Sequence, residues 1–90
     1  MSSFAIIKKN ERKRNMKELT IKLTNVKDIR DFVNQVILVD YEVDLIQGRY
    51  VIDAKSIMGI FSLDLLSPIK LTAHTDNADK LFENIAKFAV

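Results

Sequence analysis

The chain has 90 residues, 48% of them hydrophobic and 29% charged, with a formal net charge of +2. This length predicts a single domain with no room for a second one, and the composition is that of an ordinary soluble protein. No apolar run approaches the roughly 20 residues of a membrane-spanning helix, and the absence of cysteine excludes disulfides and thiolate metal ligands.

The basic residues are concentrated at the N-terminus. Residues 1–17 carry six Lys or Arg side chains and one Glu, a net charge of +5, so the remaining eight basic and eleven acidic side chains give residues 18–90 a net charge of −3. Residues 1–16 lack sustained periodicity, which predicts a basic, disordered arm before a folded domain over residues 17–90. The arm has three open interpretations: translation starts at Met16, the arm contacts RNA or an acidic membrane surface, or it is inert.

The first half of the domain predicts a strand and then a helix. Leu19, Ile21 and Leu23 alternate with polar residues between positions 18 and 23, the period of a half-buried strand. Asn25 is a candidate N-cap, with Asp28 three residues later. A helix ending near Leu38 is then indicated by an apolar stripe at Val26, Ile29, Phe32, Val33, Val36 and Ile37.

A hairpin and a short helix are expected next. Val43 and Leu45 continue an alternation that begins at Tyr41, and Gln47-Gly48 forms the turn into a strand over residues 49–53. Ser56 stands where a helix would begin. The apolar residues that follow are too many for one sheet face, so part of the cluster is expected to be exposed as a partner surface: Ile57, Met58, Ile60, Phe61, Leu63 and Leu65.

A fourth strand and a last helix complete the chain. Pro68 ends the apolar segment, residues 69–73 alternate as a strand, and Thr75 or Asp76 is expected to cap the helix. The helix stripe comprises Ala78, Leu81, Phe82, Ile85, Phe88 and Ala89. The order β-α-β-β-α-β-α predicts an α+β fold with helices on one face of a four-stranded sheet. Periodicity alone leaves a ferredoxin-like sandwich equally open.

A sequence motif narrows this choice. The stretch from Arg49 to Leu63, Arg-Tyr-Val-Ile-Asp-Ala-Lys-Ser-Ile-Met-Gly-Ile-Phe-Ser-Leu, resembles the segment around the regulatory serine of HPr, the small phosphocarrier of the bacterial sugar phosphotransferase system. The order of elements is also that of HPr, so the resemblance spans about residues 17–90. It implies an HPr-like open-faced sandwich, a four-stranded antiparallel sheet covered on one face by three helices.

The phosphocarrier motif of that family does not match. HPr proteins carry phosphate on a histidine in a Gly-(Ile/Leu)-His-Ala-Arg-Pro loop near the N-terminus, whereas the corresponding residues 23–29, Leu-Thr-Asn-Val-Lys-Asp-Ile, contain neither histidine nor proline. No side chain from Thr24 to Arg30 can form a phosphoramidate by the family mechanism. The chain is therefore more similar to the serine-only HPr paralogues that act in catabolite repression, and we expect histidine-dependent phosphotransfer to be lost.

Ser56 is the main candidate for regulation. The ordinary interpretation is an N-cap whose hydroxyl accepts from backbone N–H groups. The resemblance implies that Ser56 is the target of an HPr serine kinase and that the phosphorylated form binds a transcriptional regulator or another phosphotransferase-system protein. A phosphate dianion would there meet unpaired N–H groups and the adjacent Lys55.

The residues beside Ser56 form the candidate docking surface. The resemblance implies that Lys55, Ile57, Met58 and Phe61 meet partner proteins. Ile57 and Phe61 are four positions apart and share a helix face. Core packing is the alternative, especially for Met58 and Ile60.

Other chemistry finds little support. His74, the single histidine, is either a substitute phosphate carrier or a solvated or locally capping residue, and the second interpretation is favoured. Asp40, Glu42 and Asp44 are expected on the wet face of a strand. With two glycines and no metal-ligand spacing, we expect no catalytic residue, cofactor, metal or small-molecule substrate, and nucleic-acid binding by the fold is not expected.

The sequence thus predicts a cytoplasmic, non-enzymatic regulatory and docking module that is switched at Ser56. The cytoplasmic location follows from the apolar patch that precedes the basic residues, the reverse of a secretory signal. Two alternatives stay open: a phosphocarrier that uses His74, and a constitutive docking domain whose basic arm binds RNA or a membrane surface.

Overall fold

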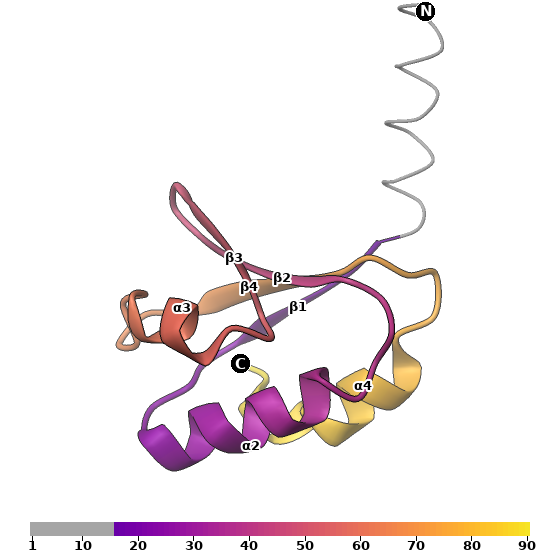
Figure 1. Ribbon diagram of the computed structural model, residues 1–90, viewed down its shortest axis with the longest axis horizontal. Coiled ribbons are helices and arrows are strands. Elements are labelled where there is room, and N and C mark those ends of the chain that lie inside the picture. Colours follow the sequence, from indigo (N-terminus) through magenta and orange to yellow (C-terminus); the bar gives the residue numbers. More distant parts are fainter. Residues whose placement is uncertain (1–15) are drawn as a thin grey trace, which may run out of the picture.

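A computed structural model describes residues 16–90, so the predicted arm, apart from Met16, lies outside the described residues. The described chain forms a sheet with helices against one of its faces (Figure 1). Its elements are β1 (Lys17–Ile21), α2 (Val26–Val36), β2 (Val43–Gln47), β3 (Tyr50–Asp53), α3 (Ile57–Phe61), β4 (Ile69–Ala73), α4 (Asp79–Asn84) and the 3-10 helix η1 (Ala86–Phe88).

The sheet has the strand order β1-β4-β2-β3, and every neighbouring pair is antiparallel. Figure 1 shows α2 and α4 on the same side of this sheet, and α3 packs against α2. The predicted α+β fold and the predicted order of elements are therefore confirmed.

The core lies between the sheet and the helices. Leu71 of β4 is paired with Leu19 on one side and Leu45 on the other. These three side chains form a row across the strands, on the sheet face that the helices cover. Phe32 of α2 contacts Phe88 of η1 edge to face, with ring centroids 6.2 Å apart. Polar residues of the same strands, such as Lys70, point to the opposite, helix-free face, as the period of two requires.

Helix α2 begins with the predicted cap. The Asn25 Oδ1 accepts from the backbone N–H of Asp28 at 2.8 Å, and the Asp28 carboxylate accepts from the Thr24 hydroxyl at 2.9 Å. The helix ends at Val36, two residues before the predicted end near Leu38. Leu38 instead lies in a turn, with 75% of its surface exposed.

Loss of this cap should destabilise the domain. We expect Asn25→Ala to lower the free energy of unfolding by about 1 kcal/mol, because a first-turn N–H loses its acceptor. Asn34→Ala, at an exposed position of the same helix, should change it by less than about 0.5 kcal/mol. Urea denaturation followed by circular dichroism measures both, and equal effects would show that the Asn25 cap contributes nothing specific.

The β2–β3 hairpin turns at Gly48 and Arg49. Gly48 has φ +58°, and no non-glycine residue of the described chain has a positive φ. A left-handed glycine at the first central position is typical of a type II′ turn, whose twist matches the flanking strands. The predicted hairpin is confirmed, although β3 begins at Tyr50 instead of residue 49.

The start of the last helix was predicted wrongly. Neither Thr75 nor Asp76 is its cap: α4 begins at Asp79 with Ala78 as N-cap residue and no side-chain cap. The Thr75 hydroxyl accepts from the Asn77 N–H at 3.2 Å, and the Asn77 side chain accepts from the Asp79 N–H at 3.1 Å. These local bonds hold the chain in a turn and delay the helix.

The end of the last helix also differs from the prediction. The chain leaves α4 at Asn84, continues as η1, and is extended at Ala89, which forms a bridge with Ile21 of β1. Ala89 therefore does not belong to the buried helical stripe. The main-chain bonds of its neighbours, from the Lys22 N–H to the Phe88 carbonyl and from the Val90 N–H to the Thr20 carbonyl, hold this end of the chain beside β1.

Candidate functional site

Ser56 lies in a tight turn between β3 and α3. Its backbone N–H donates to the Asp53 carbonyl at 2.9 Å, and the Asp53 carboxylate accepts from the Lys55 N–H at 2.9 Å. The Ser56 Oγ accepts from the Gly59 N–H at 3.2 Å. Ser56 is thus the predicted N-cap of α3, and its side chain is exposed to solvent.

There is little room for a side chain at position 59, beside the Ser56 hydroxyl. A Cβ at position 59 would lie 3.3 Å from the Ser56 Oγ and 3.4 Å from the Cδ1 of Ile52. The glycine of the Ser-Ile-Met-Gly motif therefore has a packing role in this structure. It lets the first turn of α3 lie against β3 while Ser56 keeps its capping position.

The apolar residues of α3 divide between the core and the surface. Ile60 is fully buried and Ile57 is half-buried against the core, whereas Met58 is 75% exposed and Phe61 42% exposed. Met58 and Phe61 are three positions apart, so they are neighbours on the helix surface. We call Ser56, Met58 and Phe61 together the α3 surface.

The exposed fractions show which of these residues pack in the core. Ile60 belongs to the core, as that alternative predicts, but Met58 does not. The described α3 surface therefore places a hydroxyl beside two exposed apolar side chains. Such a surface can bind another protein and can change its charge when the hydroxyl is modified.

Lys55 has a different position from the α3 surface. It is half-buried, and its Nζ donates to the backbone carbonyl of Val39 at 3.0 Å. Val39 follows the end of α2, so this bond connects the turn before α3 to the α2–β2 connection. In this arrangement the ammonium group already has a partner.

The loop before α2 uses its polar side chains for capping. Thr24 and Asn25 both hydrogen-bond with Asp28, and Arg30 is exposed on the first turns of the helix. Capping of α2 is thus a sufficient reason for an asparagine at position 25.

His74 forms a long-range pair that was not predicted. Its Nε2 lies 2.7 Å from the Oδ2 of Asp44, and the side chains are 31% and 30% exposed. The backbone N–H of His74 donates to the Glu42 carbonyl at 2.8 Å. The expectation of a solvated or locally capping histidine is therefore wrong, because the β2–β4 register brings His74 beside Asp44. Asp44 itself lies on the polar face of β2, between buried Val43 and Leu45, as expected.

His74 also lies far from the loop before α2. Ala73, the preceding residue, pairs with Lys17 at the start of β1, whereas β1 ends at Ile21 before that loop. The histidine and the loop are consequently at opposite ends of the strand.

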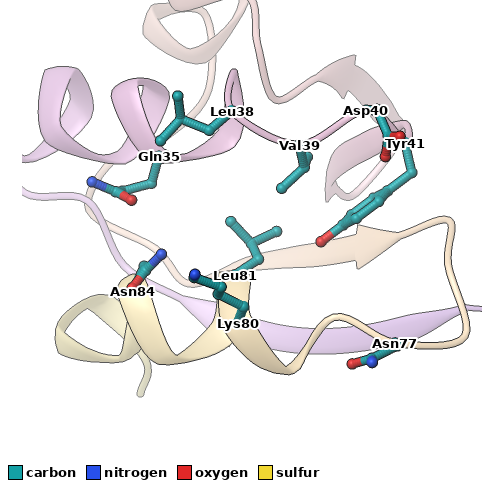
Figure 2. Close-up of a pocket in the computed structure, with 9 residues that line it drawn as sticks. All are labelled: Gln35, Leu38, Val39, Asp40, Tyr41, Asn77, Lys80, Leu81 and Asn84. Carbon is teal, nitrogen blue, oxygen red and sulfur yellow. The ribbon is translucent and has the colours of Figure 1, made fainter.

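A pocket of about 630 Å³ lies elsewhere, between the end of α2 and α4 (Figure 2). Figure 2 shows Val39 and Tyr41 turned toward Leu81. Burial raises the pKa of the Tyr41 phenol, and the nearby Asp40 carboxylate raises it further. No sequence pattern predicts this pocket, because its lining comes from separate segments: Gln35, Leu38, Val39, Asp40, Tyr41, Asn77, Lys80, Leu81 and Asn84.

The remaining charged contacts are on the surface. The Asp31 carboxylate lies 3.3 Å from Lys27 Nζ and 3.5 Å from Lys87 Nζ. The hydrogen bond from Lys27 lowers the pKa of Asp31, and the positive charges of Lys27 and Lys87 act in the same direction.

Residues 16–90 contain no group of three or more His, Asp or Glu side chains arranged to hold a metal ion. Over the same residues, every helix is too short or too polar to cross a membrane.

Comparison with known proteins identifies the fold. No protein-family model matches the sequence, and no curated protein matches it significantly. The solved structure of HPr-C-His from Thermoanaerobacter tengcongensis is 26% identical with a TM-score of 0.65, over 79% of this chain and 88% of that one. The phosphocarrier protein HPr from Bacillus anthracis str. Ames is 21% identical with a TM-score of 0.64, over 83% of this chain and 98% of that one. The chain therefore has the HPr-like fold, as the Arg49–Leu63 motif predicts.

Proposed function

We propose that this chain is an HPr-like regulatory and docking module of the cytoplasm, related to the bacterial sugar phosphotransferase system and switched by phosphorylation of Ser56. The observation that carries the proposal is the α3 surface, in which an exposed serine hydroxyl stands beside exposed Met58 and Phe61. The HPr-like fold supports it, because the two solved structures compared above are both HPr proteins.

The proposed switch acts through charge. Phosphorylation adds about −1.5 to −2 charges and strong acceptor oxygens. Placed on Ser56, the new charge would lie at the first turn of α3, where backbone N–H groups lack helical carbonyl partners. The helix would stay folded, while the α3 surface would become attractive to a partner with cationic side chains and less attractive to an acidic one.

The proposed partners are an HPr serine kinase and, after phosphorylation, a transcriptional regulator or another phosphotransferase-system protein. Met58 and Phe61 supply the apolar contact to both. Because such contacts concentrate binding energy in a few residues, a single charged substitution there should weaken recognition strongly.

We propose further that histidine phosphotransfer is absent. The loop before α2 has no histidine, and its Thr24 and Asn25 side chains are occupied with the helix cap. His74 lies at the other end of β1, and its Nε2 is paired with Asp44. Both observations oppose a carrier role at the family's position or at a substitute one.

Phosphorylation kinetics test the docking role. We expect Met58→Lys to lower kcat/KM for ATP-dependent phosphorylation by purified HPr serine kinase at least about tenfold, equivalent to about 1.4 kcal/mol. The reason is that the substitution removes an apolar contact and adds a charge. Leu38→Lys is the matched control, since Leu38 is also 75% exposed but follows α2, and it should leave kcat/KM unchanged. Equal losses in both variants, or no phosphorylation of the wild-type chain, would contradict the proposal.

A further inference from the structure

One edge of the sheet is open. Among residues 16–90, strand β3 pairs only with β2, whereas beside β1 the last residues form a bridge from Ala89 to Ile21 and a bond from the Val90 N–H to the Thr20 carbonyl. Tyr50 and Val51 of β3 are 61% and 62% exposed. Of the features that protect natural edge strands, β3 has a short length of four residues, but it contains no lysine or proline, and its register with β2 has no bulge.

The hairpin register shows which backbone groups point outward. Gln47 and Tyr50 close the two-residue turn, so they form a hydrogen-bonded pair. Hydrogen-bonded and non-hydrogen-bonded pairs alternate along an antiparallel ladder. Ile46 and Val51 are therefore a non-hydrogen-bonded pair, and both the N–H and the C=O of Val51 point away from β2.

The sequence of this edge is complementary to itself. In an antiparallel pairing centred on Val51, Val51 meets Val51 of a second copy and Tyr50 meets Ile52. Arg49, the turn residue that precedes β3, then comes opposite Asp53. Arg49 and Asp53 are both exposed, and neither forms an ion pair among residues 16–90. Opposite charges that face each other across strands stabilise a pairing, and the two-fold symmetry forms this contact twice.

The position of Asp53 adds a second reason. Within one copy Asp53 is paired with Asp44 across the hairpin, which places two carboxylates side by side. Like charges at directly opposite positions are unfavourable. Asp44 has His74 as a partner, and Arg49 of a second copy would supply the cation that Asp53 lacks.

We propose that two copies of this chain associate through their β3 edges, antiparallel and centred on Val51, so that two four-stranded sheets become one continuous sheet. The Val51 N–H of each copy donates to the Val51 carbonyl of the other, and Tyr50 covers the half-buried Ile52 of the other copy. A single short strand buries little area, so the dimer is weak and depends on concentration. An unrelated extended peptide could meet the same backbone groups, but it would lack the symmetric charge match.

Cysteine cross-linking tests the register, since the natural chain contains no cysteine. In a hydrogen-bonded antiparallel pair the Cα atoms are about 5.5 Å apart, within the roughly 4.4–6.8 Å that a disulfide spans. Two Tyr50 residues would be offset along the strands and roughly 8 Å apart. Tyr50→Cys is therefore a control of nearly equal exposure. We expect Val51→Cys to form disulfide dimers at least about tenfold faster under mild oxidation, whereas equal rates would overturn the proposal.

Charge exchange tests the same pairing without a covalent bond. Arg49→Asp and Asp53→Arg each place like charges opposite one another, so each variant alone should be monomeric. Their equimolar mixture restores both opposite-charge contacts and should recover the dimer in sedimentation velocity at about 0.15 M salt, where the Debye length is about 8 Å. A wild-type chain that stays monomeric up to millimolar concentration, or a mixture of folded variants that does not associate, would overturn the proposal. Should Asp53→Arg fail to fold, the cysteine comparison decides, because it leaves Asp53 and its bond to Lys55 in place.

Discussion

Replacement of Phe32 by alanine is expected to lower the free energy of unfolding by about 3–5 kcal/mol. Phe32 is fully buried, and its ring packs edge to face on Phe88 at 6.2 Å, which connects α2 to the C-terminal segment. Small domains are stable by only about 5–15 kcal/mol in total. The variant should therefore lose a large part of its stability, as measured by urea denaturation.

The control for this substitution lies on the same helix. Val26→Ala removes an apolar side chain that is 55% exposed, so it should change the free energy of unfolding by less than about 0.5 kcal/mol. Similar losses at Phe32 and Val26 would contradict the described core between the sheet and α2.

Ser56→Ala is expected to abolish ATP-dependent phosphorylation by HPr serine kinase. The proposal assigns the phosphate to this one hydroxyl, so intact-mass measurement should show no gain in the variant. The substitution also removes the acceptor of the Gly59 N–H and should cost about 1 kcal/mol of stability, which leaves the domain folded.

Ser62→Ala is the matched control for phosphorylation. Ser62 is exposed at the other end of α3, where its hydroxyl donates to the Gly59 carbonyl. This variant should accept phosphate as the wild-type chain does. A mass gain that persists in Ser56→Ala, or that disappears in Ser62→Ala, would place the modification elsewhere.

The strands were predictable because the sheet has one apolar and one polar face. Leu19 and Leu71 each lie between two polar residues in their own strands, and the structure pairs them in one row with Leu45. The start of α2 was predictable for a similar reason, since Asn25 and Asp28 form a local cap. Signals of this kind depend only on neighbours in sequence.

Features that depend on packing were not predictable. The His74–Asp44 pair joins residues that are 30 positions apart and requires the β2–β4 register. The start of α4 depended on a competition between local side-chain bonds at Thr75 and Asn77 and the helix itself. The pocket near Tyr41 required the placement of α4 against the end of α2.

The candidate site was predicted in part. The residue type and position of Ser56 indicated an N-cap, which the structure confirms. A helix of five residues is too short for periodicity to show which residues it buries, so the exposure of Met58 needed the structure. No sequence pattern predicts the bond from Lys55 Nζ to the Val39 carbonyl, which joins residues 16 positions apart.

The most direct test of a serine-switched module without histidine phosphotransfer compares two phosphorylation reactions on the full wild-type chain. One contains HPr serine kinase and ATP, and the other contains the first enzyme of the phosphotransferase system and phosphoenolpyruvate. Intact-mass and site-mapped mass spectrometry reads both, under conditions that preserve phosphohistidine. The account predicts phosphate on Ser56 in the first reaction and none in the second. Phosphate on His74 from phosphoenolpyruvate would contradict it.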